Sequence, residues 1–208
     1  MASKKTQEPE IRSWSDLQTS DARWVALKKI DFIDQTGTPR SWEVAVRKTT
    51  SSSGVDAVAI GNILVHPSKP PSTMLVIQYR PPLGKYTVEW PAGLIDEGET
   101  AEQAAVREMK EETGYEGRIL ETSPAVSSDP GLTNATLQLV MMEVKLKADE
   151  PMPEQRLDDG ELIERVVVPL NELYDRLLKW SQDDKYMVAG KLFYFAAGMN
   201  FAKSSGYV

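Results

Sequence analysis

The 208-residue chain has 41% apolar residues, enough for an ordinary hydrophobic core, and no cysteine, which excludes disulfides, thiolate zinc sites and a cysteine nucleophile. Its net charge of −7 argues against general nucleic-acid binding. The opening MASKKTQEPE lacks the apolar segment of a secretory signal, and no run approaches the roughly 18 apolar residues of a membrane-spanning helix, so we expect a protein of the cytosol or nucleus that contacts no membrane.

The amino-terminal part of the chain predicts a flexible segment followed by a β-hairpin. Residues 1–20 are mostly polar, as in loosely ordered chain ends. In residues 23–50, two strand-like stretches flank DQTGTP, whose Asp, Gly and Pro favour a turn. The polar SSSG at 51–54 follows as a joint. We therefore predict a flexible N-terminus over 1–20, a hairpin region over 21–54 and one main domain over 55–208.

The main domain mixes strand and helix patterns without strict alternation. Strand patterns lie at residues 55–65, 73–80, 86–90, 135–146 and 161–170. Helical patterns lie at residues 101–113, 171–180 and 185–204. Between them, PAGLIDEGE at 91–99 is typical of a loop. This mixture favours an α/β fold of the α+β type, in which helices pack on a sheet.

The predicted helix at 101–113 has clear boundary signals at both ends. Thr100 and Gln103 have the spacing of a capping box, in which each side chain bonds the other residue's backbone N–H. Gly114 stands where a glycine commonly ends a helix. The residues between contain no Pro or Gly and consist mostly of strong helix formers.

The same helix carries an unusual cluster of carboxylates. We expect its sheet-facing side to consist of Ala105, Val106 and Met109. Glu108, Glu111 and Glu112, at i, i+3 and i+4, then share an adjoining face, where like charges repel. Two interpretations fit this spacing. One is a solvated acidic face, and the other is a site for a hard divalent cation that cancels the repulsion.

The segment GLIDEGETAEQAAVREMKEETGY resembles the Nudix signature at every fixed position. The matching residues are Gly93, Glu99, Arg107, Glu108, Glu111, Glu112 and Gly114, followed by the bulky Tyr115. A chance match is on the order of one in a million for a chain of this length. The resemblance implies a Nudix α/β/α sandwich with a mixed β-sheet, here with the added hairpin. It also implies hydrolysis of a nucleoside diphosphate linked to another moiety, with Mg²⁺ as the cofactor and Mn²⁺ as a substitute.

The resemblance also implies roles for individual residues of the signature. The carbonyl of Ala92 and the side chains of Glu108 and Glu112 would bind the metal, joined by Glu111. Arg107 would orient a glutamate. In catalysis these side chains would act with Glu161.

Glu161 lies in DDGEL and matches a glutamate on a mobile loop that touches metal or activates water in the family. From the residues alone, this segment is a surface turn made by Gly160. Glu164 is the alternative base. The residues therefore leave the identity of the base open.

The similarity extends from about residue 20 to about residue 200. YRPPLGKYTVEWPAGLIDEGET, SPAVSSDPGLTNATL, the tryptophan-bearing hairpin and DDGELIE resemble the eukaryotic ADP-sugar (ADP-ribose) pyrophosphatases. This implies cleavage of ADP-ribose into AMP and ribose 5-phosphate. The alternatives are a Nudix hydrolase for an oxidised nucleoside diphosphate, another nucleotide sugar or NADH, and a non-catalytic module that binds ADP-ribose.

In that subfamily, Trp24 and Trp42 match a pair that stacks on adenine, one from each subunit of a homodimer. Stacking contributes roughly 1–3 kcal/mol per base. The alternation of Trp42 with Val44 and Val46 instead predicts a core position. Further implied substrate contacts are Glu43, Arg47, Arg80, Leu94 and Asp129.

Overall fold

The computed structural model describes residues 7–50 and 54–207. Residues 51–53 of the joint predicted at 51–54 lie outside the described residues, as do residues 1–6 and residue 208. The strands are β1 (Val25–Ile33), β2 (Pro39–Arg47), β3 (Ala57–Val65), β4 (Ser72–Arg80), β5 (Lys85–Glu89), β6 (Ala92–Leu94), β7 (Arg118–Thr122), β8 (Val126–Ser127), β9 (Thr136–Lys145), β10 (Glu164–Pro169) and β11 (Tyr186–Val188). The helices are α1 (Ala101–Thr113), α2 (Leu173–Ser181) and α3 (Gly190–Ser205), with a short 3₁₀ turn, η1 (Pro81–Leu83). None of the described helices has the length and apolar character needed to cross a bilayer.

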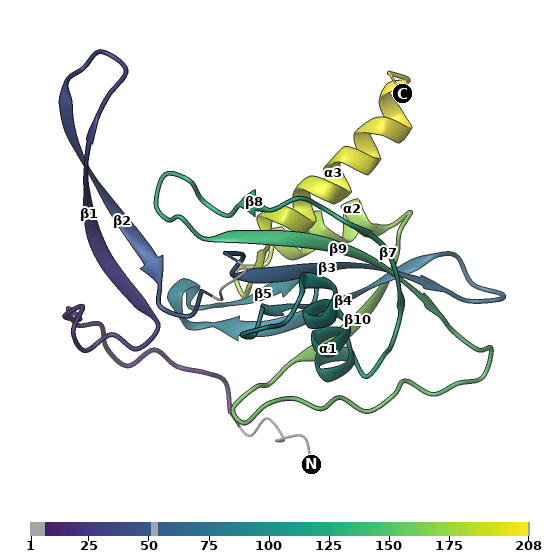
Figure 1. The fold of residues 1–208 in the computed structure, drawn as a ribbon. Helices are drawn as coiled ribbons and strands as arrows, with labels where there is room; N and C mark the ends of the chain where they lie inside the picture. Colours follow the sequence, from purple (N-terminus) through teal and green to yellow (C-terminus); the bar gives the residue numbers. More distant parts are fainter. Residues whose placement is uncertain (1–6, 51–53, 208) are drawn as a thin grey trace.

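A nine-stranded mixed sheet forms the centre of the molecule (Figure 1). Its main path runs β11-β5-β4-β3-β9-β7, with β10 paired to β4, β6 to β3 and β8 to β9. The β3–β9 and β11–β5 pairs are parallel, and the other pairs are antiparallel. The mixed sheet and its helices confirm the predicted fold class.

Apolar residues on the two faces of the sheet build two separate cores. Met74 of β4 packs with α1, whereas its neighbours Leu75 and Ile77 pack with α2 and α3. Successive strand residues point to opposite faces, so one strand serves both layers. The result is the α/β/α sandwich that the sequence predicted.

Strands β3 and β4 share only one register pair, Leu64 with Ser72, and a buried side chain closes the gap between them. Asn62 donates from Nδ2 to the Met74 carbonyl at 2.9 Å and accepts the Met74 N–H at 2.7 Å. The amide thus replaces two ladder bonds where the strands diverge, and no buried polar group is left without a partner there.

The hairpin of β1 and β2 forms its own two-stranded sheet and projects away from the sandwich (Figure 1). Its turn lies where DQTGTP predicted it: Asp34 accepts the N–H groups of Thr36 and Thr38 at 2.9 Å each and is bonded by Arg40 Nε at 3.0 Å. Before it, residues 7–20 contain no helix or strand. The division of the chain into parts at residues 20 and 54 stays a prediction.

Two expectations for the helices are wrong. The helical pattern at 185–204 begins with a strand, because Tyr186–Val188 pairs in parallel with β5 and α3 begins only at Gly190. Val106 was expected to face the sheet but is 37% exposed. Ala104 takes the inward place beside Ala105 and Met109, since neighbouring helix residues lie about 100° apart around the axis.

Candidate active site

The start and end of α1 confirm the predicted capping signals. Thr100 Oγ1 accepts the Gln103 N–H at 3.2 Å, and Gln103 Oε1 accepts the Thr100 N–H at 2.8 Å. Gly114 ends the helix with a φ of 78°, a left-handed conformation that favours glycine. Both ends are therefore set locally, and they determine which side chains face the preceding loop.

Arg107 connects the loop before α1 to the carboxylates on it. Its guanidinium donates to both Glu99 oxygens at 3.0 and 2.9 Å, to Glu108 at 2.7 Å and to Glu111 at 3.2 Å. It also donates to the Leu94 carbonyl at 3.0 Å. The Glu99 hydrogen bonds raise the pKa of Arg107, and the same bonds lower the pKa of Glu99. Arg107 therefore contacts three glutamates and one backbone carbonyl at once.

Glu108 and Glu112 lie against the short strand β6 and are largely removed from water. Glu112 is only 3% exposed and accepts the Ala92 N–H at 3.2 Å, so the solvated acidic face, one of the two interpretations of the spacing, is wrong for this residue. A Cβ at Gly93 would overlap the Glu108 carboxylate, which explains the glycine. Burial and, after it, the charges of Glu108 and Glu161 together raise the pKa of Glu112 to about 8. Burial also raises the pKa of Glu108, against the effect of Arg107.

A second charged group lies beside these carboxylates. Arg80, the last residue of β4, donates from Nε and Nη2 to Glu89 at 2.8 and 3.2 Å. Burial lowers the pKa of Arg80, but the bond to Glu89 and the negative charges of Glu89, Glu112 and Glu161 together outweigh burial and raise the pKa. Lys191 at the start of α3 has its pKa lowered, first by burial and then by Arg47 and Arg80, against the opposing effect of Glu89. Cationic side chains from β2, β4 and α3 thus converge around one glutamate.

Sequence reasoning missed Glu89 and Lys191. Glu89 occupies an ordinary position in the strand pattern YTVEW, and its one signal is a charge at the end of a buried strand. Lys191 falls in a segment with a mainly apolar pattern. Both become neighbours of Arg80 only through pairing of β5 with β4 and β11, which local sequence does not specify.

The structure places the residues expected to bind adenine in another group, on the hairpin. Trp24 and Trp42 are 54% and 52% exposed, so the core position that alternation predicted for Trp42 is wrong, because no layer covers that face of β2. Trp42 Nε1 donates to the Gly131 carbonyl at 3.1 Å, in the turn that contains Asp129. Glu43 is exposed next to Trp42.

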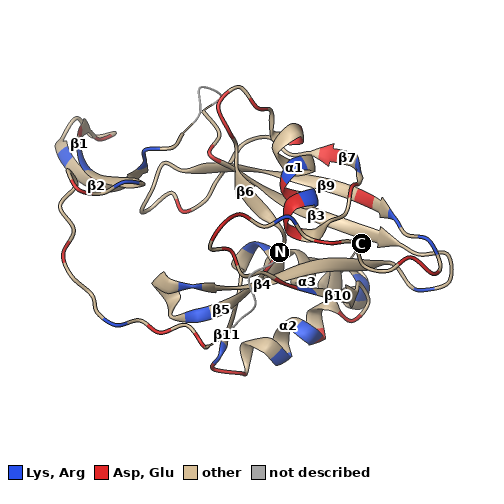
Figure 2. Ribbon diagram, turned by 90° about the horizontal axis from the view of Figure 1, so that it is seen from below, with Lys and Arg blue, Asp and Glu red and all other residues tan. Residues whose placement is uncertain are grey.

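Acidic positions on α1 gather near the centre of the molecule when it is viewed from below (Figure 2). In the part of the chain that the structure describes, no group of three or more His, Cys, Asp or Glu side chains forms a closed metal site. The donors present are nevertheless hard oxygen atoms, from Glu108, Glu112 and the backbone at Ala92. They fit a divalent cation whose coordination is completed by water and substrate phosphates.

The NUDIX domain model matches residues 56–190 of this chain. This stretch contains the loop, helix α1, Arg80 and Glu161. The chain therefore belongs to the Nudix family and is a Nudix hydrolase by class.

Similar proteins cover nearly the whole chain. An ADP-ribose pyrophosphatase of Saccharomyces cerevisiae is 43% identical over 188 residues, covering 89% of this chain and 81% of that protein. An ADP-sugar pyrophosphatase of Mus musculus is 36% identical over 189 residues, covering 90% and 87%. Among solved structures, an ADP compounds hydrolase matches with a TM-score of 0.59 at 22% identity, covering 99% of this chain and 100% of that one, which supports the fold.

Proposed function

We propose that this protein hydrolyses the diphosphate of ADP-sugars, chiefly ADP-ribose, to AMP and ribose 5-phosphate in the cytosol or nucleus. The observation that carries the proposal is the pair of carboxylates beside β6, formed by the buried Glu112 and the partly buried Glu108. Two neighbouring carboxylates that are largely removed from water are unfavourable without a cation. The names of the yeast and mouse relatives support an ADP-sugar as the substrate.

Mg²⁺, with Mn²⁺ as a substitute, fits this donor set. The ligands would be the Ala92 carbonyl, Glu108 and Glu112, with Glu111 close by. When bound, the cation would neutralise charge on the diphosphate and lower the pKa of a bound water. The protein's own contribution is orientation: Arg107 holds Glu108 and Glu111 in place through its bonds at 2.7 and 3.2 Å.

Arg80 and Glu161 would act on the diphosphate and the attacking water. The guanidinium of Arg80 presents a planar fork that suits phosphate oxygens, and its bonds to Glu89 keep it aimed toward the carboxylates. Glu161 would accept a proton from the water. A general base of this kind contributes about 10²–10⁴ in rate. Glu164, the first residue of β10, is the alternative base.

The adenine would stack between Trp42 of one subunit and Trp24 of a second, so the active form would be a homodimer. The exposure of both indoles supports this, since each offers accessible ring surface to a base. The Arg23 guanidinium lies over the Trp24 ring, 4.3 Å from its centroid. The remaining contacts would come from Glu43, Arg47, Leu94 and Asp129. Leu94 already lies at the site, where its carbonyl accepts from Arg107.

The test is hydrolysis of ADP-ribose with and without Mg²⁺, with products separated by chromatography, for wild type, Glu112→Gln and Glu116→Gln. Glu116 is an exposed control, paired with Lys110 at 2.5 Å. We expect metal-dependent AMP and ribose 5-phosphate, a loss on the order of 100-fold in Glu112→Gln, and no change in the control.

Two outcomes would overturn the proposal. Binding of ADP-ribose without product under any metal would make the protein a binding module. Faster turnover of an oxidised nucleoside diphosphate, another nucleotide sugar or NADH would keep the hydrolase and change its substrate.

A further inference from the structure

The segment between β9 and β10 crosses beneath α1 and carries Glu161 (Figure 1). It contacts the last turn of the helix through two hydrogen bonds: the Arg156 N–H donates to the Glu111 carbonyl at 2.8 Å, and Gln155 Nε2 to the Glu112 carbonyl at 2.6 Å. A third bond comes from β10, where Arg165 Nη1 donates to the Thr113 carbonyl at 2.6 Å. The last carbonyls of a helix have no partner within it. Here the segment and the start of β10 supply their partners.

The approach of the segment to α1 is close. A Cβ at Gly114 would lie 2.5 Å from the Glu154 carbonyl oxygen and 3.0 Å from two side-chain atoms of Pro153. Glycine at this position therefore serves the contact as well as the left-handed end of the helix. The Arg165 guanidinium strengthens the contact from the other side, since Nη1 also donates to the Pro153 carbonyl at 2.5 Å.

Gln155 is the residue that joins both ends of the loop bearing Glu161. Its Nε2 donates to the Glu112 carbonyl on α1 and also to the Ile163 carbonyl at 3.1 Å, just before β10. Ile163 is buried. Together with Arg165, which bonds Thr113 and Pro153, this amide group sets the distance between the helix and the point where the loop returns to the sheet.

Between these anchors the loop makes a tight turn that presents Glu161. Gly160 has a φ of 88°, and the Glu161 N–H donates to the Asp158 carbonyl at 3.1 Å. In return, Glu161 Oε2 accepts the Asp158 N–H at 3.1 Å. The carboxylate is close enough to Glu108 and Glu112 to influence both electrostatically. Its own turn is exposed, so its position relative to α1 depends on the anchors at the base of the loop.

We propose that Gln155 is a positioning residue for hydrolysis: by bonding Glu112 and Ile163 at once, its amide places Glu161 at the diphosphate held beside α1. The inference rests on the proposed function, with Glu161 as the base. A misplaced base loses rate, since small displacements of a reacting group are costly, whereas substrate binding elsewhere in the site is preserved.

The experiment is a double-mutant cycle of Gln155→Met and Glu161→Gln, measured as kcat and KM for ADP-ribose with Mg²⁺. Methionine keeps the length of the side chain and removes the donor. We expect Gln155→Met to lower kcat about tenfold with KM within about twofold. In the Glu161→Gln background, the same substitution should change kcat by less than about twofold, because the group it positions is already gone.

The control is Gln103→Met, which removes an amide–backbone bond at the opposite end of the same helix. It should act equally in both backgrounds. If Gln155→Met does not fold, Gln155→Leu takes its place in the cycle, because leucine also removes the donor. Gln155→Lys keeps donors on a flexible stem, so it should retain more kcat than the variant without a donor.

Each outcome of the cycle supports or overturns the positioning role of Gln155. Equal effects of Gln155→Met in both backgrounds, with wild type active, would overturn the positioning role alone. A Glu161→Gln variant with unchanged turnover would overturn it together with the base. A wild type that forms no product would overturn the proposed function itself.

Discussion

The hairpin strands β1 and β2 and the central strands β3 and β4 have the same length but differ in how far their side chains are buried. Strands β1, β2, β3 and β4 each contain nine residues. All nine residues of β1 pair with β2, yet in these two strands only Ala26 and Val44 are buried. In β4 six consecutive residues are buried, because α1 covers one face and other helices the opposite one. Backbone pairing alone therefore does not remove side chains from water, and a second layer is needed.

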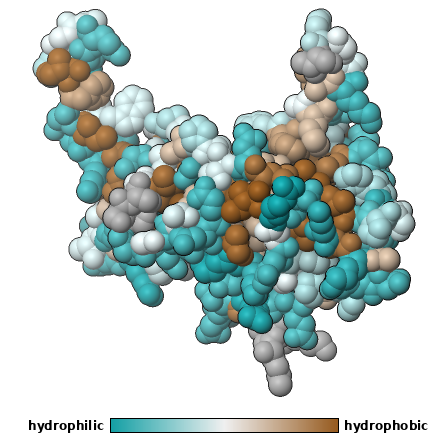
Figure 3. Space-filling model, turned by 45° about the vertical axis from the view of Figure 1, so that its right-hand side comes forward, coloured by the Kyte–Doolittle hydropathy of each residue, from teal (hydrophilic) through white to brown (hydrophobic). Residues whose placement is uncertain are grey.

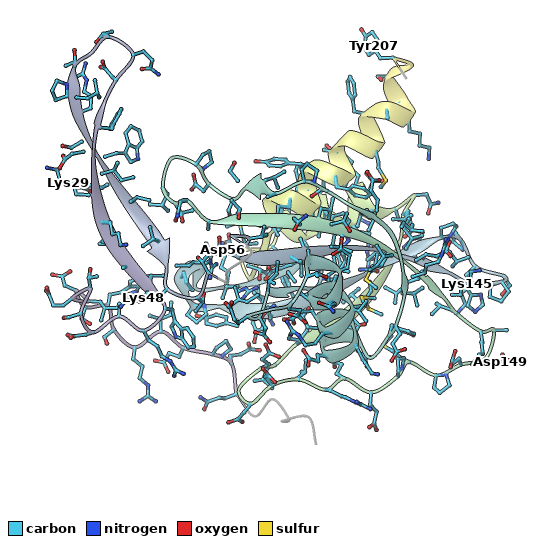
Figure 4. The ribbon with its side chains drawn as sticks, viewed as in Figure 1. Lys29, Lys48, Asp56, Lys145, Asp149 and Tyr207 are labelled. Carbon is cyan, nitrogen blue, oxygen red and sulfur yellow. The ribbon has the colours of Figure 1, made fainter. Side chains whose placement is uncertain are left out.

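The hairpin consequently displays a row of large apolar side chains. The exposed ones are Trp24, Val25, Leu27, Ile30, Phe32, Ile33 and Trp42. Figure 3 shows apolar surface on the hairpin, on the projecting helix α3 and in the hollow between them. In Figure 4, Lys29 on β1 and Tyr207 beyond α3 mark these two projections. Extended apolar surface of this kind is typical of an interaction site, which agrees with the homodimer proposed above.

The difference in burial is tested most directly by replacing one leucine with alanine in each region. Leu75→Ala in β4 should lower the free energy of unfolding by about 2–5 kcal/mol, because Leu75 is fully buried and leaves a cavity. Leu27→Ala in β1, where the leucine is 69% exposed, should stay within about 0.5 kcal/mol. Thermal unfolding of both variants checks this. A similar loss in both would mean that the hairpin is covered in solution, and the loss for Leu27→Ala would then depend on protein concentration.

The next effect concerns the buried Glu112. Its pKa is raised to about 8 from an ordinary 4.5, so the folded protein holds this proton more tightly than the unfolded chain does. Stability from this group is therefore full below pH 4.5 and is lost as the pH rises towards 8. Without metal at pH 8, Glu112→Gln should raise Tm by about 5 °C, and near pH 4 the two proteins should unfold alike. Equal Tm values at pH 8 would show that Glu112 ionises without cost.

Trp42→Ala tests the hairpin as a binding surface. We expect KM for ADP-ribose to rise about tenfold and Tm to change little, since in the proposed function the indole would stack on the base and it buries little of the fold. Trp180→Ala is the matched control, because Trp180 packs against the core beneath α2 and should lower Tm without a selective change in KM. An unchanged KM in Trp42→Ala would remove this residue from the substrate site.

The smallest effect should come from the hairpin turn. Asp34 accepts from Thr36, Thr38 and Arg40, and this network lowers its pKa well below the usual range. Asp34→Ala should leave Tm within about 2 °C, because a surface network of this kind adds little to global stability. Hydrogen exchange at the tip should nevertheless become faster. A large fall in Tm would mean that the hairpin and the sandwich unfold as one unit.

The sequence predicted those features that depend on contacts between residues close together in the chain, and it failed for those that depend on pairing of distant strands. Helix α1 was predicted with its boundaries because Thr100, Gln103 and Gly114 act on the backbone beside them. The grouping of Glu108 and Glu112 followed from helix spacing alone. In contrast, the burial of Glu112 depends on β6, which was taken for a loop and forms only by pairing with β3.

The site residues that escaped prediction share a tertiary origin. Tyr186–Val188 is a strand because β5 offers an open edge, and that pairing brings Lys191 towards Glu89. Gln155 bonds carbonyls on both sides of its own loop. None of these contacts is indicated by the sequence within a few residues of the side chain that makes it. The exposure of Trp42 is a different case, because the family resemblance implied it although the local alternation predicted a core position.

The distribution of tryptophans has an optical consequence. Trp24 and Trp42 are solvent-exposed on the hairpin, while Trp90 is buried, with its Nε1 bonded to Thr73 at 3.0 Å and its ring against Phe195. A small water-soluble quencher reaches the first two indoles and not the third. Trp14 before the hairpin is also exposed, and Trp180 on α2 is half-buried. In a Trp14→Phe variant, the quencher-accessible fraction of the intrinsic fluorescence therefore reports chiefly on whatever comes to cover the hairpin, without any added label.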